Sequence, residues 1–238
     1  MRPVIVFTDG AAKGNPGPGG WAAVILTPGG RIREFGGGSL HTTNNRMELT
    51  GPIRALSHLE SVPGDIAIYT DSTYVIRGIR EWIPNWKRRG WKTIDGKDVL
   101  NRELWEELWD LVQRRPGKLD WHYVRGHTGV PGNERVDEIA NAFALHEDPG
   151  LYEGPVQDYP LNLLDLPSDT RLPVASGSGG KNKKAYSYVS VVDGVPMRHA
   201  TWTECEQRVK GRSGARFKKS ISKEDEAEIL KSWGFDGK

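Results

Sequence analysis

Two short stretches of the sequence decide the fold: VIVFTDG at residues 4–10 and IAIYTDS at residues 66–72. Each is an apolar run that ends in Thr-Asp and is followed by a small residue, which is the pattern of a buried strand. Two strands that end alike can lie side by side in one sheet. We therefore expect the carboxylates of Asp9 and Asp71 to meet at one edge of that sheet.

Two further carboxylates are predicted on helices. Glu48 follows TTNN at residues 42–45, a strong N-cap cluster, so it lies early in a helix. Asp137 falls in the first turns of another helix with an apolar inward face. Pro52 lies inside the first of these helices and removes the backbone bond to the Glu48 carbonyl, so we expect a tightened turn or a kink there.

Carboxylates brought together in this way repel one another unless a cation lies among them. Ligand sets made of oxygen alone select hard ions such as Mg²⁺ or Mn²⁺ over zinc. Two such ions are the usual machinery for cleaving a phosphodiester. Any single Asp or Glu is more often a solvated surface charge or a helix cap, and it is the four acids with their flanking residues that favour a metal site.

The flanking residues form five motifs in unbroken order. They are FTDG (7–10) with GNPGPGG (14–20), TTNNRMEL (42–49), TDS (70–72) with Tyr74, GH (126–127), and NER (133–135) leading into Asp137. This series resembles type 1 ribonuclease H over about residues 3–146, roughly three fifths of the chain. The resemblance implies an α/β fold, the ribonuclease H-like mixed five-stranded sheet with helices on both faces.

The resemblance also implies a reaction. Asp9, Glu48, Asp71 and Asp137 would hold two Mg²⁺ ions, with Mn²⁺ able to substitute, and the RNA strand of an RNA/DNA hybrid would be hydrolysed to leave 5′-phosphate and 3′-hydroxyl ends. His127 stands in a glycine-rich loop and could assist the departing product. A lone loop histidine is usually only solvated, but the Gly-His match favours a catalytic role.

Substrate contacts are predicted in two places. Glycines of the 14–20 loop let backbone approach the minor groove, where the 2′-hydroxyl is read, although they also simply make a hairpin. The segment from Arg80 to Lys92 interleaves tryptophans with cations and resembles a basic protrusion of type 1 enzymes. Trp82 and Trp86 could instead be a core stripe at helical spacing, with at least one of the two buried. The candidate residues are Gly10, Asn15, Thr43, Asn44, Asn45, Trp82, Trp86, Lys87, Arg88 and Arg89.

Beyond the five motifs the chain changes character. We expect a ribonuclease H catalytic domain at 1–146, an acidic Pro/Gly/Ser-rich linker at 147–183 and a small α+β domain of three strands and two helices at 184–235. Leucines at 161, 163 and 164 could fix part of the linker to the first domain, and SGSGG at 176–180 reads as a flexible tether.

The last domain carries TWTEC (201–205) and ARFKK (215–219), which resemble the viroplasmin-like hybrid-binding domain of eukaryotic ribonuclease H1. In that family the domain usually precedes the nuclease, whereas here it follows. Residues 181–238 are basic, with 13 Lys/Arg against 8 Asp/Glu. This excess favours a nucleic-acid partner, although a basic stretch is also a common means of keeping a protein in solution. The resemblance implies substrate contacts from Tyr188, Trp202, Phe217, Lys218 and Lys219, unless these aromatics only form the domain's own core.

Several broad classes are disfavoured. The single Cys205 cannot form an internal disulfide, so we expect a reducing compartment. No apolar run is long enough to cross a bilayer, and a strand begins too early for a signal peptide, so we expect a cytoplasmic monomer without an obligatory protein partner. The alternatives are a catalytically silent hybrid-binding protein and an integrase-like enzyme, the latter disfavoured by the glycine loop and the tryptophan-rich segment.

Overall fold

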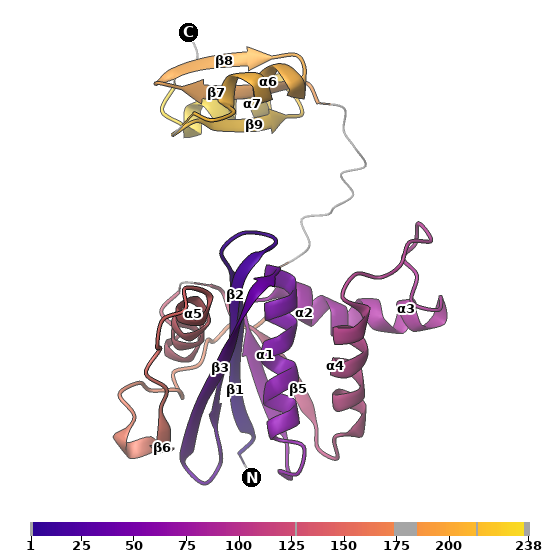
Figure 1. The fold of residues 1–238 in the computed structure, drawn as a ribbon, viewed down its shortest axis with the longest axis vertical. Helices are drawn as coiled ribbons and strands as arrows, with labels where there is room; N and C mark the ends of the chain where they lie inside the picture. The colour runs from indigo at the N-terminus through magenta and orange to yellow at the C-terminus, as the bar shows by residue number, and fades with distance from the viewer. Residues whose placement is uncertain (1, 127, 174–184, 213, 236–238) are drawn as a thin grey trace. The chain divides into compact units, whose positions relative to one another are not determined.

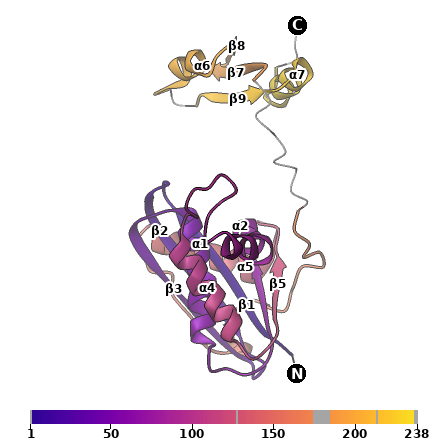
Figure 2. The same ribbon diagram turned by 90° about the vertical axis from the view of Figure 1, so that its right-hand side faces the viewer.

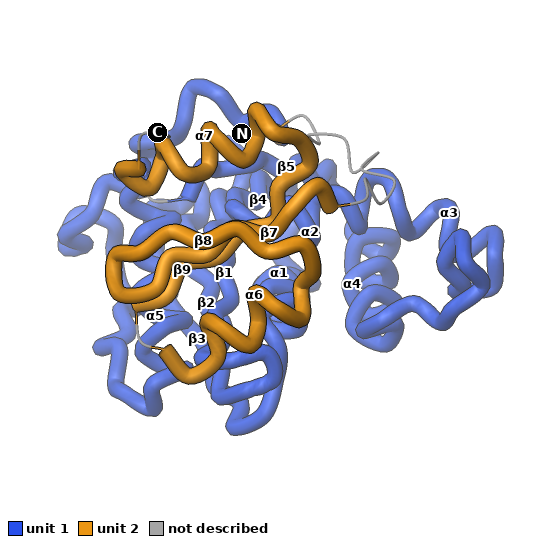
Figure 3. Tube along the Cα trace, turned by 90° about the horizontal axis from the view of Figure 1, so that it is seen from above, with its two compact units in different colours: residues 1–172 blue, residues 173–238 orange. Residues whose placement is uncertain are grey.

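The computed structural model describes residues 2–126, 128–173, 185–212 and 214–235. The chain divides into two compact units, residues 1–172 and 173–238, which Figure 3 shows in different colours. Each unit is described by itself below. His127 and the expected tether at 176–180 lie outside the described residues. Among the described residues, no helix combines the length and apolar character that a bilayer span requires.

The first unit is built on a mixed sheet, as predicted. Its strand order is β5-β4-β1-β2-β3-β6, in which β1 pairs in parallel with β4 and antiparallel with β2. The prediction of five strands is wrong by one, because a short sixth strand from beyond residue 146 covers the outer edge of β3. The strands are β1 (Val4–Ala12), β2 (Gly17–Leu26), β3 (Arg31–Thr42), β4 (Ile66–Thr70), β5 (Leu119–Tyr123) and β6 (Glu153–Pro155).

Helices cover both faces of this sheet (Figures 1 and 2). Because side chains alternate along β1, Val4 and Val6 join a core with α1 and α4 on one face, while Ile5 and Phe7 join a core with α5 on the other. The helices are α1 (Asn44–His58), α2 (Thr73–Arg77), the π-helical turn η1 (Gly78–Trp82), α3 (Ile83–Arg88), α4 (Arg102–Arg114) and α5 (Pro131–Ala144). Pro52 is buried within α1 and does not end it.

The expected linker from residue 147 onward is in large part a component of the first unit. It forms β6 and a short 3-10 turn, η2 (Val156–Asp158). Tyr159 and Leu163 are buried in the core beneath α5, whereas Leu164 is 47% exposed. The first unit therefore extends to residue 172, and the boundary expected at 146 falls inside it. The apolar residues among the prolines explain this, since they find a place on the α5 face of the sheet.

A buried ion pair fixes this segment to α5. Arg135 donates two hydrogen bonds of 2.8 Å to Glu34 of β3, whose side chain is fully buried. Tyr159 donates to the same carboxylate through its hydroxyl, and Tyr152 through its backbone N–H at 3.0 Å. Burial alone would raise the pKa of Glu34, but the bonds from Arg135 and the tyrosines outweigh it and lower that pKa.

The second unit has the predicted three strands and two helices. Its antiparallel sheet has the order β8-β7-β9. Asp193 and Gly194 take positive φ angles of 52° and 76° at the β7–β8 turn, as the Asp-Gly pair predicts. Thr201 and Glu204 form the expected capping box at the start of α6. The elements are β7 (Ser187–Val192), β8 (Val195–His199), α6 (Trp202–Val209), β9 (Arg216–Ser220) and α7 (Lys223–Ser232).

Two adjacent leucines test whether the segment after residue 146 stabilises the first unit. Leu163→Ala should lower the free energy of unfolding by about 2–4 kcal/mol, because it leaves a cavity where the side chain is now 1% exposed. Leu164→Ala, the matched control, should cost less than about 1 kcal/mol, since that side chain is half in solvent. Urea unfolding of the full chain measures both, and equal small effects would mean that the segment is only a tether.

Candidate active site

The strand register brings the two Thr-Asp motifs together. Phe7 of β1 lies beside Tyr69 of β4 in the parallel pair, so Asp9 and Asp71, each two residues further on, reach the same end of the sheet. Asp9 lies within β1, which continues beyond it, whereas Asp71 directly follows β4. Glu48 comes from the first turns of α1 and Asp137 from the second turn of α5. Four elements on both faces of the sheet thus contribute one acid each.

Gly10 makes the close approach of α1 possible. A Cβ atom at Gly10 would lie 2.2 Å from the backbone nitrogen of Glu48, so any other residue would push the start of α1 off β1. Gly126 has a similar place, since its Cβ would come within 2.9 Å of Asp71 Oδ2. The glycines in the FTDG and GH motifs therefore set how closely the acids gather.

The carboxylates act on one another electrostatically. Asp9 is only 7% exposed, and burial, followed by the negative charge of Asp71, raises its pKa well above the ordinary value. The bond from the Gly10 N–H lowers that pKa, while the charges of Asp137 and Glu48 raise it further. The pKa of Glu48 is also raised, first by burial and then by Asp71, against bonds that lower it. Burial and the neighbouring negative charges thus oppose the ionisation of Asp9 and Glu48.

Hydrogen-bond donors hold the Glu48 carboxylate in place from two sides. Asn44 donates to Glu48 Oε1 at 2.7 Å, and Ser72 donates to Glu48 Oε2 at 2.8 Å. Ser72 also caps α2 by accepting from Val75 N. Sequence reasoning quoted Ser72 in the TDS motif but gave it no role. Its position as an N-cap directly after Asp71 is the signal that could have found it.

Asp9 and Asp137 are bonded within their own elements. Gly10 N donates to Asp9 Oδ1 at 2.7 Å, and Asn141, one helical turn after Asp137, donates to Asp137 Oδ1 at 2.7 Å. Asn141 was missed by sequence reasoning altogether. An amide four residues after a carboxylate on a helix is the signal that points to it.

The donor set fits hard divalent cations, since it consists of carboxylate oxygens that repel one another. Among the residues that the structure describes, no three His, Cys, Asp or Glu side chains converge closely enough to hold one ion as they lie. A bound cation would draw the carboxylates inward. Its attraction would offset the repulsion that, after burial, raises the pKa of Asp9.

The predicted hairpin and N-cap residues lie at one end of the sheet. Gly17 pairs with Thr42, which brings the 13–16 loop near the start of α1. Asn15 and Asn45 are exposed, whereas the Asn44 amide is engaged with Glu48. Thr43 is the N-cap residue of α1 by position but makes no side-chain capping bond.

Two tryptophans of the predicted protrusion, Trp82 and Trp86, are half-buried, and the third, Trp91, is buried. Trp82 and Trp86 pack against Trp105 of α4, with ring centroids 6.5 and 5.6 Å apart, and Gly78 leaves room for the Trp105 ring. Trp82 and Trp86 thus pack partly against the core, as the core-stripe alternative predicts. Neither is fully buried, so the expectation that at least one of the two would be buried is wrong. The cations Lys87, Arg88 and Arg89 are exposed at the end of α3, which projects from the body of the first unit in Figure 1.

In the second unit three aromatic rings form a row. Trp202 is 39% exposed and lies between Tyr188 and Phe217, with centroids 5.7 and 5.4 Å away. Lys219 is opposite Tyr188 across the β7–β9 pair, so it shares the aromatic face. Lys218 is opposite Val189 and therefore lies on the other face. The predicted lysine pair is split between the two faces, because neighbouring strand residues alternate.

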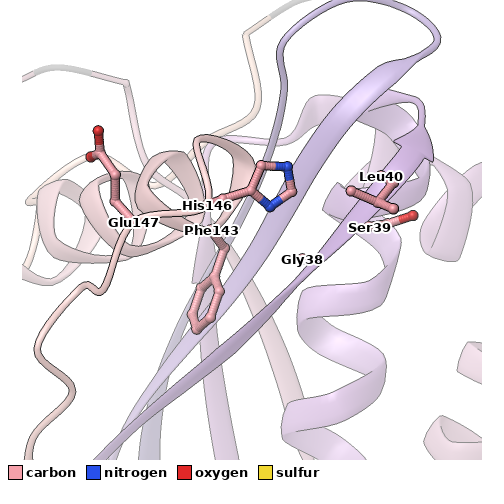
Figure 4. A pocket seen from close by; sticks show the side chains of 6 residues that line it. All are labelled: Gly38, Ser39, Leu40, Phe143, His146 and Glu147. Carbon is pink, nitrogen blue, oxygen red and sulfur yellow. The ribbon is translucent and has the colours of Figure 1, made fainter.

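A groove of about 450 Å³ lies between β3 and the end of α5 (Figure 4). Its walls are Gly38, Ser39, Leu40, Phe143, His146 and Glu147. None of the four acids lines this groove.

An α/β sheet that gathers acids from both of its faces defines a nuclease-type protein, and comparison with known proteins agrees. The family model "RNase H" matches residues 1–144, and the chain therefore belongs to the ribonuclease H family. Ribonuclease H of Cupriavidus pinatubonensis is 56% identical over 141 residues, covering 59% of this chain and 94% of that protein. Ribonuclease H of Pseudomonas paraeruginosa is 55% identical over 139 residues, covering 58% and 90%. At this identity to named enzymes, the protein is a nuclease.

Solved structures agree on the fold. LC9-RNase H1, described as a type 1 RNase H with the type 2 active-site motif, is 29% identical with a TM-score of 0.55, covering 66% of this chain and 81% of that one. A foamy viral protease-reverse transcriptase in complex with RNA/DNA hybrid is 18% identical with a TM-score of 0.53, covering 61% and 21%. The latter is similar in fold alone.

The repulsion among the acids can be measured without any cation. The pKa of Asp9 is raised in the folded state. The contribution of this carboxyl to the stability of the protein is therefore lost as the pH rises from the ordinary carboxyl pKa, about 4, through the raised pKa. Asp9→Asn should therefore stabilise the metal-free protein at pH 7 by about 1 kcal/mol or more, raising Tm by about 2–4 °C. The advantage should shrink at pH 4.

The control for this measurement is Asp110→Asn, which removes an exposed carboxylate of α4. Thermal unfolding in a chelator should give the control the Tm of the wild type at both pH values. A destabilised Asp9→Asn protein at pH 7 would contradict the repulsion.

Proposed function

We propose that this protein is an endonuclease that hydrolyses the RNA strand of RNA/DNA hybrids and leaves 5′-phosphate and 3′-hydroxyl ends. The gathering of Asp9, Glu48, Asp71 and Asp137, whose charges raise the pKa of Asp9, is the observation that carries this proposal. The family resemblance of the motifs around these acids supports the choice of substrate. We assign catalysis to the first unit, residues 1–172.

The four acids would hold two Mg²⁺ ions, with Mn²⁺ able to substitute. Bound there, these ions would supply positive charge to the attacked phosphodiester and to the water that attacks it. Asn44 and Ser72 keep both Glu48 oxygens oriented, and Gly10 orients Asp9. We assign His127, which lies outside the described residues, to proton transfer beside the departing product.

The hairpin at 13–16 and the start of α1 are our candidates for reading the hybrid. Their exposed amides, Asn15 and Asn45, can donate and accept at the wide minor groove where 2′-hydroxyls lie. Gly10 and Thr43 would shape this surface. The exposed Lys87, Arg88 and Arg89 at the end of α3 would neutralise phosphates, while the exposed parts of Trp82 and Trp86 would contact sugars.

The second unit would bind the hybrid without cutting it. The ring of Trp202, flanked by Tyr188 and Phe217, offers an apolar surface to deoxyriboses, and Lys219 adds a cation on the same face. Tyr188 also packs against the small core of Val192, Cys205 and Val209. That second role fixes its ring in place and is compatible with the first.

The alternative is a hybrid-binding protein without activity. Such a protein would gain stability by replacing Asp9 or Glu48, since the raised pKa of each carboxyl means that its ionisation costs folding free energy at neutral pH. The presence of all four acids favours the nuclease. Cleavage of a labelled hybrid with and without Mg²⁺, with duplex RNA and duplex DNA as controls, distinguishes the two.

Loss of one acid should abolish cleavage but not binding. Asp9→Asn and Asp71→Asn should each lower turnover by at least about 100-fold in Mg²⁺ while the hybrid Kd changes little, because the substitution removes charge needed by the reaction rather than by the fold. Turnover above a tenth of wild type would refute the assignment. His127→Ala should be milder and should keep the metal requirement.

The two lysines of β9 provide a matched pair for the second unit. Trp202→Ala should weaken hybrid binding by about 10-fold, and Lys219→Ala should reduce the salt dependence of binding by about one phosphate contact. Lys218→Ala should change neither, since it faces away from the aromatic row. Fluorescence anisotropy at two salt concentrations measures all three, and equal effects of both lysines would contradict binding through this face.

A further inference from the structure

A chain of hydrogen bonds leads from the surface of the first unit to Asp137. Asn141 Nδ2 donates to the Asp137 carbonyl at 2.9 Å and to Asp137 Oδ1 at 2.7 Å. Asn141 Oδ1 accepts from Lys13 Nζ at 2.6 Å. Lys13 is 128 residues away in the sequence, so this bond joins the start of the chain to α5.

The chemistry of the three groups fixes the direction of this chain. An ammonium group can only donate and an ionised carboxylate can only accept, so the amide must turn its nitrogen to Asp137 and its oxygen to Lys13. The amide is held at both ends. The charge on Lys13 also polarises it, which strengthens the bond that its N–H group makes to the carboxylate. Asp137 Oδ1 is thereby occupied by a donor.

Lys13 belongs to the hairpin between β1 and β2, the dark indigo loop in Figure 1. It directly follows Ala12, which pairs with Gly19, and its backbone N–H donates to Pro18 O at 2.7 Å. A Cβ atom at Gly17 would lie 2.5 Å from the Lys13 carbonyl oxygen, so the hairpin is folded tightly over this residue. A shift of the hairpin would therefore move the lysine.

We propose that Asn141 is a positioning residue for Asp137 and that Lys13, acting through Asn141, couples the β1–β2 hairpin to the affinity of the acids for divalent cations. The proposal rests on the function proposed above, because it takes the hairpin as a surface that faces the hybrid. A hybrid seated on the hairpin would hold Lys13 and hence the Asp137 carboxylate in one orientation. Cation binding and substrate binding would then favour each other.

The first test measures cation binding without substrate. Calorimetric titration of the full chain with Mg²⁺ should show Asn141→Ala binding about 10-fold more weakly, the low end of the range for residues that orient metal ligands. Lys13→Ala should reduce the affinity for Mg²⁺ by a smaller factor than Asn141→Ala does. The double variant should have the same Mg²⁺ affinity as Asn141→Ala alone, because Lys13 acts through Asn141. Lys13→Arg should restore the wild-type value, since it keeps a donor there.

Asn85→Ala is the matched control for the helix. Asn85 also donates from its amide to the carbonyl four residues earlier, that of Glu81 at 2.8 Å, but on α3. It should leave Mg²⁺ binding unchanged. Thermal unfolding in a chelator should give all variants similar Tm values, which separates positioning from damage to the fold.

The second test separates coupling from direct contact. In hybrid cleavage, Lys13→Ala should raise the Mg²⁺ concentration needed for half-maximal turnover, and excess Mg²⁺ should restore kcat. A rise in KM alone, with Mg²⁺ binding unchanged, would make Lys13 a phosphate contact and overturn the coupling. Unchanged Mg²⁺ binding by Asn141→Ala would overturn the positioning role. A wild type that binds Mg²⁺ but cuts no hybrid would instead refute the proposed function.

Discussion

Four negative charges have to be held near one another against their own repulsion, and the first unit is arranged around that requirement. The parallel pairing of β1 with β4 sets Asp9 beside Asp71, and the missing side chain of Gly10 lets α1 bring Glu48 against them. Burial, and after it this repulsion, raises the pKa values of Asp9 and Glu48. A sheet with a helix layer on each face is rigid enough to store this cost, which two loops would relieve by moving apart.

Much of this arrangement could be predicted from the sequence, because its determinants are local. The two Thr-Asp runs indicated strands, the TTNN cluster indicated the start of α1, and the Asp-Gly and Thr-x-x-Glu signals indicated the turn and the capping box of the second unit. Each of these signals acts within a few residues. The four acids followed from them, since strand ends and helix starts determine where a side chain can go.

What the sequence did not reveal depends on contacts between distant residues. Prolines between residues 149 and 167 suggested a linker, and Leu163, expected to fix part of it to the first domain, is indeed buried, but the burial of Tyr159 and the extension of the first unit to residue 172 were not foreseen. The split of Lys218 from Lys219 follows from the register of β9 with β7, which no local pattern encodes. Ser72 was overlooked because its role depends on Glu48, 24 residues away in the sequence. The bond from Asn141 to Asp137 spans only four residues, so Asn141 is an exception: a local signal was present and was not used.

The buried pair of Glu34 and Arg135 has a consequence for how the chain is made. Glu34 is synthesised early, Arg135 a hundred residues later, and Tyr159 later still, although all three share one fully buried carboxylate. During synthesis, the Glu34 charge on β3 therefore cannot be buried with its partner until α5 has emerged from the ribosome. The α5 face of the sheet in turn stays uncovered until the segment with Tyr159 and Leu163 has been made. The first unit should therefore become resistant to protease only after residue 163 has left the exit tunnel, which is later than the synthesis of Asp137, the last of the four site acids.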